Sequence, residues 1–540
     1  MCGICGVVGH HQDDVLPLLI QLTSINWYRG HDAVGNTVIN HHTGAMRRHV
    51  SARKQKSREN PLDGEYRRVV TGNAKGIEAT MALGQTKFTT VALSAEEGFV
   101  EINTQPLNLS YPRDDLLIPE VTGVHNGEVY VDSITPHIKT PSLSKAVVDS
   151  RYLIEIFHEK LREFRDPWQA AEWVMDHVVG AFTFGFSDGK YLFFFKDKGG
   201  IRPGVVGRAK GKYGELYVVN SEDGYFGQFG IRRGVEDYSD GHIEGGEAIL
   251  LQPGRPPVRM RLRKEADTPC YFEAHYLQRH FSLVSSGEMS NSEFRAREAA
   301  DVAKLYAEDI QDYDFVFPVP KSGNSFARKF ADVVRLPYRD DVCRKPEIPG
   351  EAEVRNYLIA RLAKFHSFEF TGPDVYGKDG VAIDDSIVGG DSSVQLFLDW
   401  QAYGGKRLTV VSCAPPKMKK CPYGVGFPED KDLVANEMLE RGIASWNGEI
   451  VYDIRDANAF VTDKMRKRIV EQAEKQGRNV EPGDFRVLYA PIKVIRENGR
   501  YLSRSGKICD YCLSGRRVDY NRTHDLVQAE GVPIAPRMGN

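Results

Sequence analysis

The sequence contains no apolar run long enough to cross a membrane. Its longest apolar runs, such as residues 191–195, are far shorter than the roughly 20 residues that a spanning helix needs. The N-terminus also lacks the basic region followed by an apolar core that marks an export signal. We therefore expect a cytosolic protein that has no membrane partner.

Neither sign of charge is in excess. The chain has 71 Lys and Arg against 74 Asp and Glu, a formal net charge of -3, so nucleic acid is not an expected partner. Cysteine is scarce too, with eight in 540 residues. That number does not make a disulfide scaffold, and in a reducing compartment each cysteine is a buried thiol, a nucleophile or a metal ligand.

The length of the chain predicts more than one domain, because 540 residues are too many for one ordinary hydrophobic core. Residues 1–255 alternate short β-rich stretches with Gly-rich turns, which is typical of stacked sheets. Residues 256–440 alternate apolar strands with helical patterns, as a parallel sheet requires. Residues 441–540 form a smaller segment with an amphipathic helix at 462–476.

The second residue is a candidate nucleophile. The chain begins Met1-Cys2-Gly3, and removal of Met1 leaves a free α-amine on the residue that bears the thiol. An α-amine has an ordinary pKa of about 8, so its neutral fraction accepts the thiol proton without a histidine partner. The alternative is that Cys2 is a second residue that merely carries a thiol.

The order of motifs over residues 1 to about 250 resembles that of the class II glutamine amidotransferases. The segments that carry the resemblance are the Arg-Gly-x-Asp-x-x-Gly turn at 29–35, Asn-Thr-Gln-Pro at 103–106 and His-Asn-Gly-Glu at 125–128. The resemblance implies a four-layer αββα domain of the Ntn-hydrolase type with Cys2 as nucleophile. It also implies that the Asn126 side chain and the Gly127 N–H form an oxyanion hole, in which each donor is worth about 10²–10³ in rate.

The same resemblance implies how glutamine is held. In the family an Arg binds the α-carboxylate and an Asp binds the α-ammonium, and Asp149 matches the Asp position. Lys87 stands where the family usually has the Arg, and a point charge in place of a bidentate fork predicts weaker or less discriminating binding. The predicted glutamine-binding residues are Arg29, Lys87, Phe88, Thr90 and Asp149.

A second motif lies at residues 380–393, where an apolar strand is followed by Asp384, Asp385 and a small-residue loop that opens a helix. Such a loop offers backbone N–H groups to a phosphate, although alone it would equally suit a generic turn. The motif resembles the phosphoribosyl diphosphate motif of type I phosphoribosyltransferases, in particular of the amidophosphoribosyltransferase family. Two other stretches resemble that family: residues 196–203 resemble its Arg-Asp-x-x-Gly-Ile-Arg-Pro stretch, and residues 319–323 resemble its diphosphate-contacting loop. The resemblance implies a phosphoribosyltransferase-like α/β domain, with Mg²⁺ on the diphosphate and a site formed by Ser322, Asp384 and Asp385.

The departures from that family gather where phosphoribosyl diphosphate would bind. Gly389 replaces an Arg of the motif Asp-Asp-Ser-Ile-Val-Arg-Gly-Thr-Thr, and Asp391 replaces a Thr. A carboxylate at about 5 Å from a phosphate charge would be repelled by about 3 kcal/mol at an effective dielectric of about 20. The Asp391 side chain is equally suited to cap the following helix. The family's mobile catalytic loop keeps only scattered basic residues at 343–350.

Four cysteines match the ligands of a [4Fe–4S] cluster that a subset of amidophosphoribosyltransferases carries. Two of them form a C-x-x-C pair, whose spacing lets both thiolates bind one metal centre. The predicted ligands are Cys270, Cys421, Cys509 and Cys512. Tetrahedral zinc and four unrelated buried thiols are the alternatives. The remaining cysteines are expected to be packing residues, and they are Cys5, Cys343 and Cys413.

These observations predict a two-site enzyme. Cys2 hydrolyses glutamine through a thioester, and ammonia passes internally to an acceptor in the second domain. The resemblance implies that this acceptor is phosphoribosyl diphosphate and that the product is 5-phosphoribosylamine, the entry step of purine biosynthesis. One alternative keeps the glutaminase but has a different nucleotide-like or carboxyl-derived acceptor. In another the second domain is not catalytic and serves as a scaffold or nucleotide sensor. We also expect a homo-oligomer.

Overall fold

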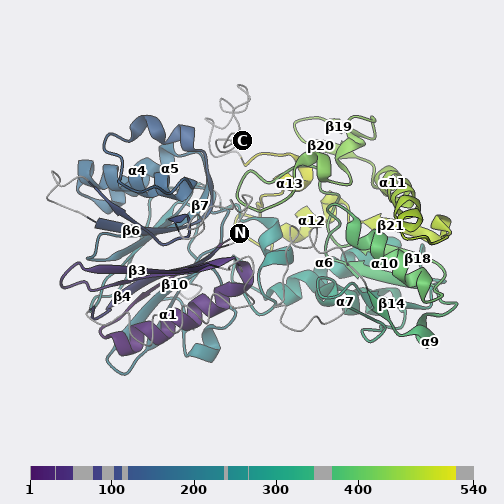
Figure 1. Ribbon diagram of the computed structural model, residues 1–540, viewed down its shortest axis with the longest axis horizontal. Helices are drawn as coiled ribbons and strands as arrows, with labels where there is room; N and C mark the ends of the chain where they lie inside the picture. The colour runs from purple at the N-terminus through teal and green to yellow at the C-terminus, as the bar shows by residue number, and fades with distance from the viewer. Residues whose placement is uncertain are drawn as a thin grey trace.

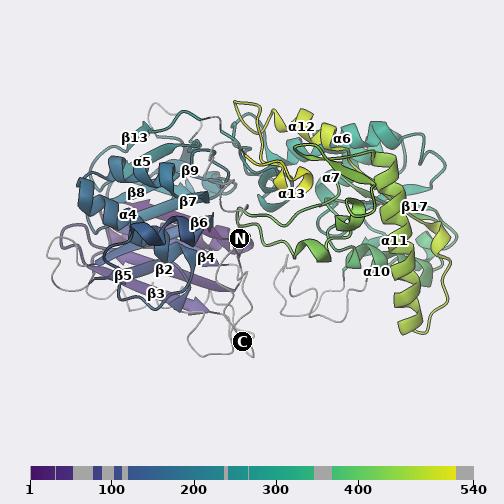
Figure 2. The ribbon, with the colours of Figure 1, turned by 90° about the horizontal axis from the view of Figure 1, so that it is seen from above.

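The computed structural model describes residues 2–30, 32–52, 77–87, 102–111, 120–235, 241–265, 267–345 and 368–518. They form two lobes that lie side by side, and the chain begins where the lobes meet (Figure 1), as the view from above also shows (Figure 2). Within these ranges, no helix combines the length and the apolar composition that a bilayer span requires.

The first lobe contains two antiparallel sheets. The seven-stranded sheet has the order β11-β9-β10-β1-β4-β2-β3, and its strands are β1 (Gly3–Val8), β2 (Ala33–Ile39), β3 (Met46–Ala52), β4 (Met81–Lys87), β9 (Val205–Lys210), β10 (Glu215–Asn220) and β11 (Arg232–Arg233). The six-stranded sheet has the order β13-β12-β8-β7-β6-β5, and its strands are β5 (Leu107–Ser110), β6 (Glu120–Val129), β7 (Gly180–Ser187), β8 (Leu192–Lys196), β12 (Glu247–Leu251) and β13 (Val258–Arg261).

Helices cover the outer face of each sheet. Helix α1 (Gln12–Asn26) packs on β1 and β4, whereas α4 (Asp149–Phe164) and α5 (Pro167–His177) pack on β6 and β8. Every residue of β1 and β2 is buried, because one face meets a helix and the other meets the second sheet. The apolar layer between the sheets includes Ile4, Val124 and Phe194. These are the four αββα layers that the sequence predicts.

The second lobe is built on a parallel sheet of the order β14-β17-β18-β21. Its strands are β14 (Phe315–Pro318), β17 (Gly380–Asp384), β18 (Leu408–Ser412) and β21 (Phe485–Tyr489), and its main helices are α6 (Asn291–Tyr306), α7 (Asn324–Val334), α10 (Asp391–Ala402) and α11 (Ile454–Lys475). The βα units predicted from the sequence are therefore present. Because β21 and α11 lie after residue 440, the C-terminal segment completes this sheet, and the exact domain boundaries stay a prediction.

Smaller elements connect the lobes or decorate the parallel sheet. They are a π-helix (Glu273–Leu277), β15 (Cys343–Arg344), β16 (Glu369–Phe370), α9 (Gly372–Val375), β19 (Ala444–Trp446), β20 (Ile450–Tyr452), α12 (Ile492–Gly499) and α13 (Tyr511–Ser514). Helix α11 begins earlier than the predicted 462–476, because the Asp453 side chain caps it by accepting hydrogen bonds from the Arg455 and Asp456 N–H groups.

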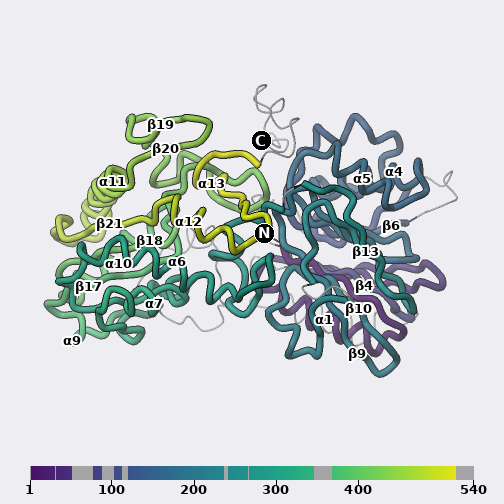
Figure 3. The backbone as a smooth tube through the Cα atoms, turned by 180° about the vertical axis from the view of Figure 1, so that it is seen from behind, coloured from purple at the N-terminus to yellow at the C-terminus, as the bar shows by residue number. Residues whose placement is uncertain are grey.

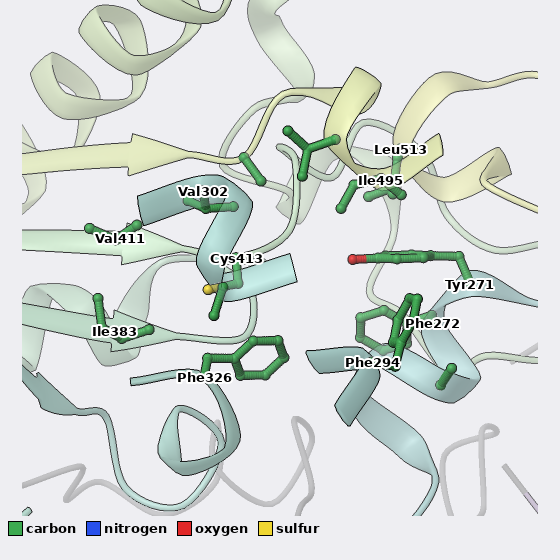
Figure 4. Packing of buried hydrophobic residues seen from close by; sticks show 14 of the residues in the cluster. Tyr271, Phe272, Phe294, Val302, Phe326, Ile383, Val411, Cys413, Ile495 and Leu513 are labelled. Carbon is green, nitrogen blue, oxygen red and sulfur yellow. The ribbon is translucent and has the colours of Figure 1, made fainter. Parts of the chain in front are cut away.

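One apolar cluster joins the parallel sheet to the segment around Tyr271 and Phe272. Figure 4 shows Cys413 in this cluster beside Phe326, at the end of the strands that carry Ile383 and Val411. Cys5 and Cys343 are buried in other apolar clusters. The three cysteines without predicted partners therefore pack in cores, as expected.

Candidate active sites

Cys2 lies half-buried at the start of β1, between the two lobes (Figure 3). Its carbonyl oxygen accepts a hydrogen bond of 3.3 Å from Arg29 Nε. The guanidinium of Arg29 is buried and donates to Glu222 at 2.7 Å and to Glu273 at 2.8 Å. Arg29 thus fixes the backbone of Cys2, the predicted nucleophile, and its contact with glutamine stays a prediction.

The predicted oxyanion hole lies on β6. Asn126 is fully buried, yet neither its amide nitrogen nor its amide oxygen has a hydrogen-bond partner among the residues that the structure describes. A buried amide without a partner costs about 1–3 kcal/mol, so its retention favours a functional reason. Gly127 has a φ of 147°, and a Cβ there would lie 1.9 Å from the Ala181 carbonyl oxygen, so only glycine fits.

A network of buried polar side chains fixes this strand. Gln85 Nε2 donates to the His125 carbonyl oxygen at 3.2 Å, and the Gln85 side-chain oxygen accepts from the Gln105 N–H at 3.1 Å. The Gln105 side chain in turn contacts the His125 N–H and donates to the Ser150 hydroxyl at 2.6 Å. Residues from two of the resembling motifs, 103–106 and 125–128, are therefore held with Gln85 and Ser150 in one hydrogen-bonded unit beside the predicted hole.

The structure brings Lys87 and Asp149 toward Cys2. Lys87 Nζ donates to the Asn103 carbonyl oxygen at 2.6 Å, and its charge interacts with Cys2 and Asp149. Burial lowers the pKa of Lys87 from its ordinary value, although those neighbours oppose the shift. Asp149 accepts from the Val129 N–H at 3.1 Å and begins α4. Phe88 and Thr90 lie outside the described residues.

The second lobe contacts the predicted oxyanion hole through Gly424. A Cβ on Gly424 would lie 2.7 Å from the carbonyl carbon of Gly127, so the two backbones are in direct contact. Glu128 follows Gly127 in the chain, and its pKa is raised to about 7, mainly by burial and then by the charge of Asp149. Sequence reasoning missed this contact, because nothing in the Cys421–Gly424 region indicates a partner almost 300 residues earlier.

The predicted acceptor site lies at the carboxyl end of β17. Asp384 and Asp385 are buried, and Ser322 donates its hydroxyl to Asp384 at 2.6 Å, so the structure brings these three residues together. Burial and the neighbouring Asp385 carboxylate raise the pKa of Asp384 well above its usual range. Two adjacent buried carboxylates, one of them hard to ionise, favour a ligand that brings a cation or hydroxyl donors.

Beneath this acid pair lies a histidine that sequence reasoning missed. His275 Nε2 lies 3.0 Å from the Asp385 carbonyl oxygen, and its Nδ1 lies 2.7 Å from Glu298 and 2.6 Å from the Tyr271 hydroxyl. The π-helix that contains His275 also contains Glu273, the partner of Arg29 behind Cys2. One short segment therefore contacts both candidate sites.

The loop after the acid pair resolves the alternatives for Asp391. Its carboxylate accepts a hydrogen bond from the guanidinium of Arg468, and it does not cap α10. The repulsion expected from a bare carboxylate is therefore offset by a cation. In the predicted mobile loop the structure describes Cys343 to Lys345, where Arg344 pairs with Glu369 at 3.1 Å, and residues 346–350 lie outside the described ranges.

The four cysteines predicted as cluster ligands are all free and buried. The backbones at Cys270 and Cys509 pair as a parallel bridge, and the charge of Cys509 interacts with each of the other three thiols. The structure thus gathers Cys270, Cys421, Cys509 and Cys512 into one neighbourhood. Burial raises the pKa of each thiol. As placed, the described residues form no group of three or more Cys, His, Asp or Glu that suits a metal ion.

A buried lysine lies beside these thiols. The Lys417 ammonium is 3.3 Å from the ring centroid of Phe272 and 3.8 Å from that of Phe427, and it has no hydrogen-bond partner in the part of the chain that the structure describes. Its charge interacts with those of Cys512, Asp385, Cys270 and Cys421. Burial nevertheless lowers the pKa of Lys417 to about 8. Such an orphaned cation fits a neighbour that carries negative charge.

Known amidophosphoribosyltransferases are similar in sequence to most of this chain. This chain is 25% identical to the amidophosphoribosyltransferase of Pasteurella multocida over 461 residues, which are 81% of this chain and 83% of that protein. It is 26% identical to that of Saccharomyces cerevisiae over 504 residues, 86% of this chain and 90% of that protein. A match to that of Mycobacterium bovis is 29% identical over 282 residues, half of each chain. No protein-family model matches the chain.

Two solved structures share the fold over almost the whole chain. A glutamine phosphoribosylpyrophosphate amidotransferase from B. subtilis, complexed with ADP and GMP, covers 96% of this chain with a TM-score of 0.69 and 18% identity. A structure described as the allosteric regulatory enzyme of purine biosynthesis covers 95% with a TM-score of 0.70 and 19% identity. The predicted fold class, an αββα domain of the Ntn type followed by a phosphoribosyltransferase-like α/β domain, is therefore confirmed.

Proposed function

We propose that this chain is a glutamine-dependent amidotransferase that forms 5-phosphoribosylamine from glutamine and phosphoribosyl diphosphate. The observation that carries the proposal is the fully buried Asn126 amide, which lacks a partner among the described residues and stands in a His-Asn-Gly motif. The similarity to amidophosphoribosyltransferases over more than four fifths of the chain supports the same reaction.

At the first site, Cys2 is the nucleophile and its own α-amine is the base. The thiolate attacks the amide carbon of glutamine, and the resulting oxyanion accepts hydrogen bonds from the Asn126 amide and the Gly127 N–H. Collapse expels ammonia, which takes a proton from the α-ammonium, and leaves a thioester. Water then attacks the thioester and releases glutamate and the thiol. Lys87 holds the glutamine α-carboxylate and Asp149 holds its α-ammonium.

At the second site, ammonia attacks the anomeric carbon of phosphoribosyl diphosphate and diphosphate leaves. Asp384 and Asp385 accept hydrogen bonds from the ribose hydroxyls, and Ser322 orients Asp384 through its hydroxyl group. Mg²⁺ on the diphosphate would supply charge neutralisation of the leaving group. The cytosolic location and the homo-oligomer stay predictions.

We further propose that the four cysteines hold a [4Fe–4S] cluster. Their chemistry suits it, since four buried thiols meet near a lysine that lacks a hydrogen-bond partner among the described residues, and thiolates on iron carry negative charge. Thiolates of a four-iron cluster also lie farther apart than the ligands of a single ion. Cys270, Cys421, Cys509 and Cys512 would bind it, and it would tie the C-terminal segment to both lobes.

Glutamine hydrolysis with and without phosphoribosyl diphosphate tests the proposed reaction. We expect phosphoribosyl diphosphate to accelerate the hydrolysis of glutamine. It should also be consumed, with one diphosphate released for each glutamate formed. Hydrolysis at the same rate in both conditions, with no diphosphate released, would refute the proposed acceptor. Metal analysis after anaerobic purification tests the cluster, because stoichiometric zinc without iron would exclude it.

A further inference from the structure

The loop between β17 and α10 lacks a cation of its own. Residues 386–390 read Ser-Ile-Val-Gly-Gly, so no side chain between the acid pair and α10 carries positive charge. Backbone N–H groups at such a loop attract a phosphate, but the two buried carboxylates next to it repel one. An anion in this loop therefore needs a cation from elsewhere in the fold.

Helix α11 delivers that cation. Arg468 donates one hydrogen bond to the Gly389 carbonyl oxygen and another to the Asp391 carboxylate. A Cβ on Gly390 would lie 3.2 Å from Arg468 Nη1, so the guanidinium lies directly on the loop. Helices α10 and α11 pack against each other, which fixes the approach (Figure 2). The Arg468 guanidinium therefore lies beside Gly389, the position at which the resembling motif has an Arg.

We propose that Arg468 is the phosphate-binding cation of the acceptor site and that Asp391 holds its guanidinium over the loop. The ligand group is the phosphate monoester on C5 of a ribose, and the inference rests on the proposed function of this site. A guanidinium has five N–H donors, so the contacts with Gly389 and Asp391 leave donors for a phosphate. Its side chain is 31% exposed, which leaves it accessible to a ligand.

The neighbouring cations of α11 are engaged away from this loop. Lys467 is 70% exposed and pairs with Asp463 at 2.8 Å on its own helix. Lys464 pairs with Glu437 at 2.7 Å. Lys467→Met is therefore a matched control, because it removes one positive charge from the same helix turn without touching the loop.

Affinity for ribose 5-phosphate and KM for phosphoribosyl diphosphate test the proposal in the full-length protein. We expect Arg468→Met to weaken both at least tenfold, Arg468→Lys to weaken them less, and Lys467→Met to change neither. Glutamine hydrolysis without the second substrate should keep its wild-type rate in all three variants, which also reports that they fold. Unchanged affinity for ribose 5-phosphate in Arg468→Met would overturn the proposal.

A rescue variant separates a phosphate contact from a structural role. The heavy atoms nearest to a Cβ on Gly389 are 3.6 Å away, which is ordinary van der Waals contact, so a side chain can start there without displacing the backbone. We expect Gly389→Arg in the Arg468→Met background to raise the affinity for ribose 5-phosphate at least fivefold. If Gly389→Arg does not restore the affinity that Arg468→Met loses, the proposal is contradicted. If wild type binds ribose 5-phosphate but releases no diphosphate from phosphoribosyl diphosphate, the proposed function fails and the inference about Arg468 stands.

Discussion

Gly424 of the second lobe lies against Gly127 of the first, and a Cβ on Gly424 would come within 2.7 Å of the carbonyl carbon and oxygen of Gly127. The N–H of Gly127 is one of the two proposed oxyanion donors. The position of that donor therefore depends on the loop that follows Cys421, a proposed cluster ligand. The second lobe therefore contacts the strand that carries the proposed oxyanion hole.

Gly424→Ala should impair the oxyanion hole. The added methyl group must push on the Gly127 backbone, and loss of one such donor lowers kcat for glutamine by about 10²-fold or more. Turnover with free ammonia should be retained, because that reaction bypasses Cys2. Gly442→Ala is the matched control, since Gly442 also has a positive φ of 69° but nothing lies within 4 Å of its Cβ. Equal glutamine rates in the two variants would contradict the contact.

Lys87→Arg should strengthen glutamine binding. A guanidinium offers a carboxylate two parallel hydrogen bonds where the ammonium offers a point charge, so we expect KM for glutamine to fall about fivefold, or about 1 kcal/mol. Lys87→Met should raise KM about tenfold or more. Steady-state kinetics with the exposed Lys212→Arg as control measures both effects. A KM that does not respond to either change at residue 87 would remove Lys87 from the glutamine site.

Glu128 should make stability depend on pH near neutrality. Its folded-state pKa is raised from 4.5 to about 7, mainly by burial, so its contribution is fully present below about 4.5 and is lost as pH rises through about 7. Glu128→Gln should therefore be less sensitive to a change from pH 6 to 8 than wild type, by about 1.4 kcal/mol, because about one unit of the raised pKa range lies between pH 6 and 7. Urea-unfolding midpoints at several pH values measure this. Parallel pH curves for wild type and the variant would refute it, with the exposed Glu215→Gln as control.

The site residues that the sequence predicts lie in contiguous motifs, and their roles stay predictions. Asn126 and Gly127 are neighbours in the chain, and both lie on the single strand β6. Contacts such as Arg468 with Gly389, or Gly424 with Gly127, join residues from distant segments. Only the packing of helices and loops decides them, so no local pattern reveals them.

The same reasoning explains why the sequence does not decide between a repulsive and a helix-capping role for Asp391. Its carboxylate has no partner within its own turn of α10, and the cation that neutralises it comes from α11, which lies after three further strands. Likewise, a lysine at 417 reads as a surface residue in a basic stretch, whereas the fold buries it between two aromatic rings. Burial of single polar residues is set by tertiary structure and is invisible to periodicity.

Lys417→Met should leave the four-thiolate centre without its buried counter-cation. If the proposed cluster is present, we expect its reduced state to become harder to reach, with the reduction potential lowered by about 59 mV or more for a tenfold change in the one-electron equilibrium. An anaerobic redox titration followed by absorbance measures the potential. Lys420→Met is a suitable control, because the Lys420 side chain pairs with Glu429 at 2.7 Å near the surface. Equal potentials in the two variants would contradict the role of Lys417.

The most direct test of the account is glutamine hydrolysis by the Cys2→Ala variant, measured beside its turnover with free ammonia. Since Cys2 is the proposed nucleophile and no other residue replaces its thiol, we expect the glutamine rate to fall at least about 1,000-fold. The ammonia-dependent rate should stay within about twofold of wild type. Glutamine hydrolysis by Cys2→Ala near the wild-type rate would contradict the account at its centre.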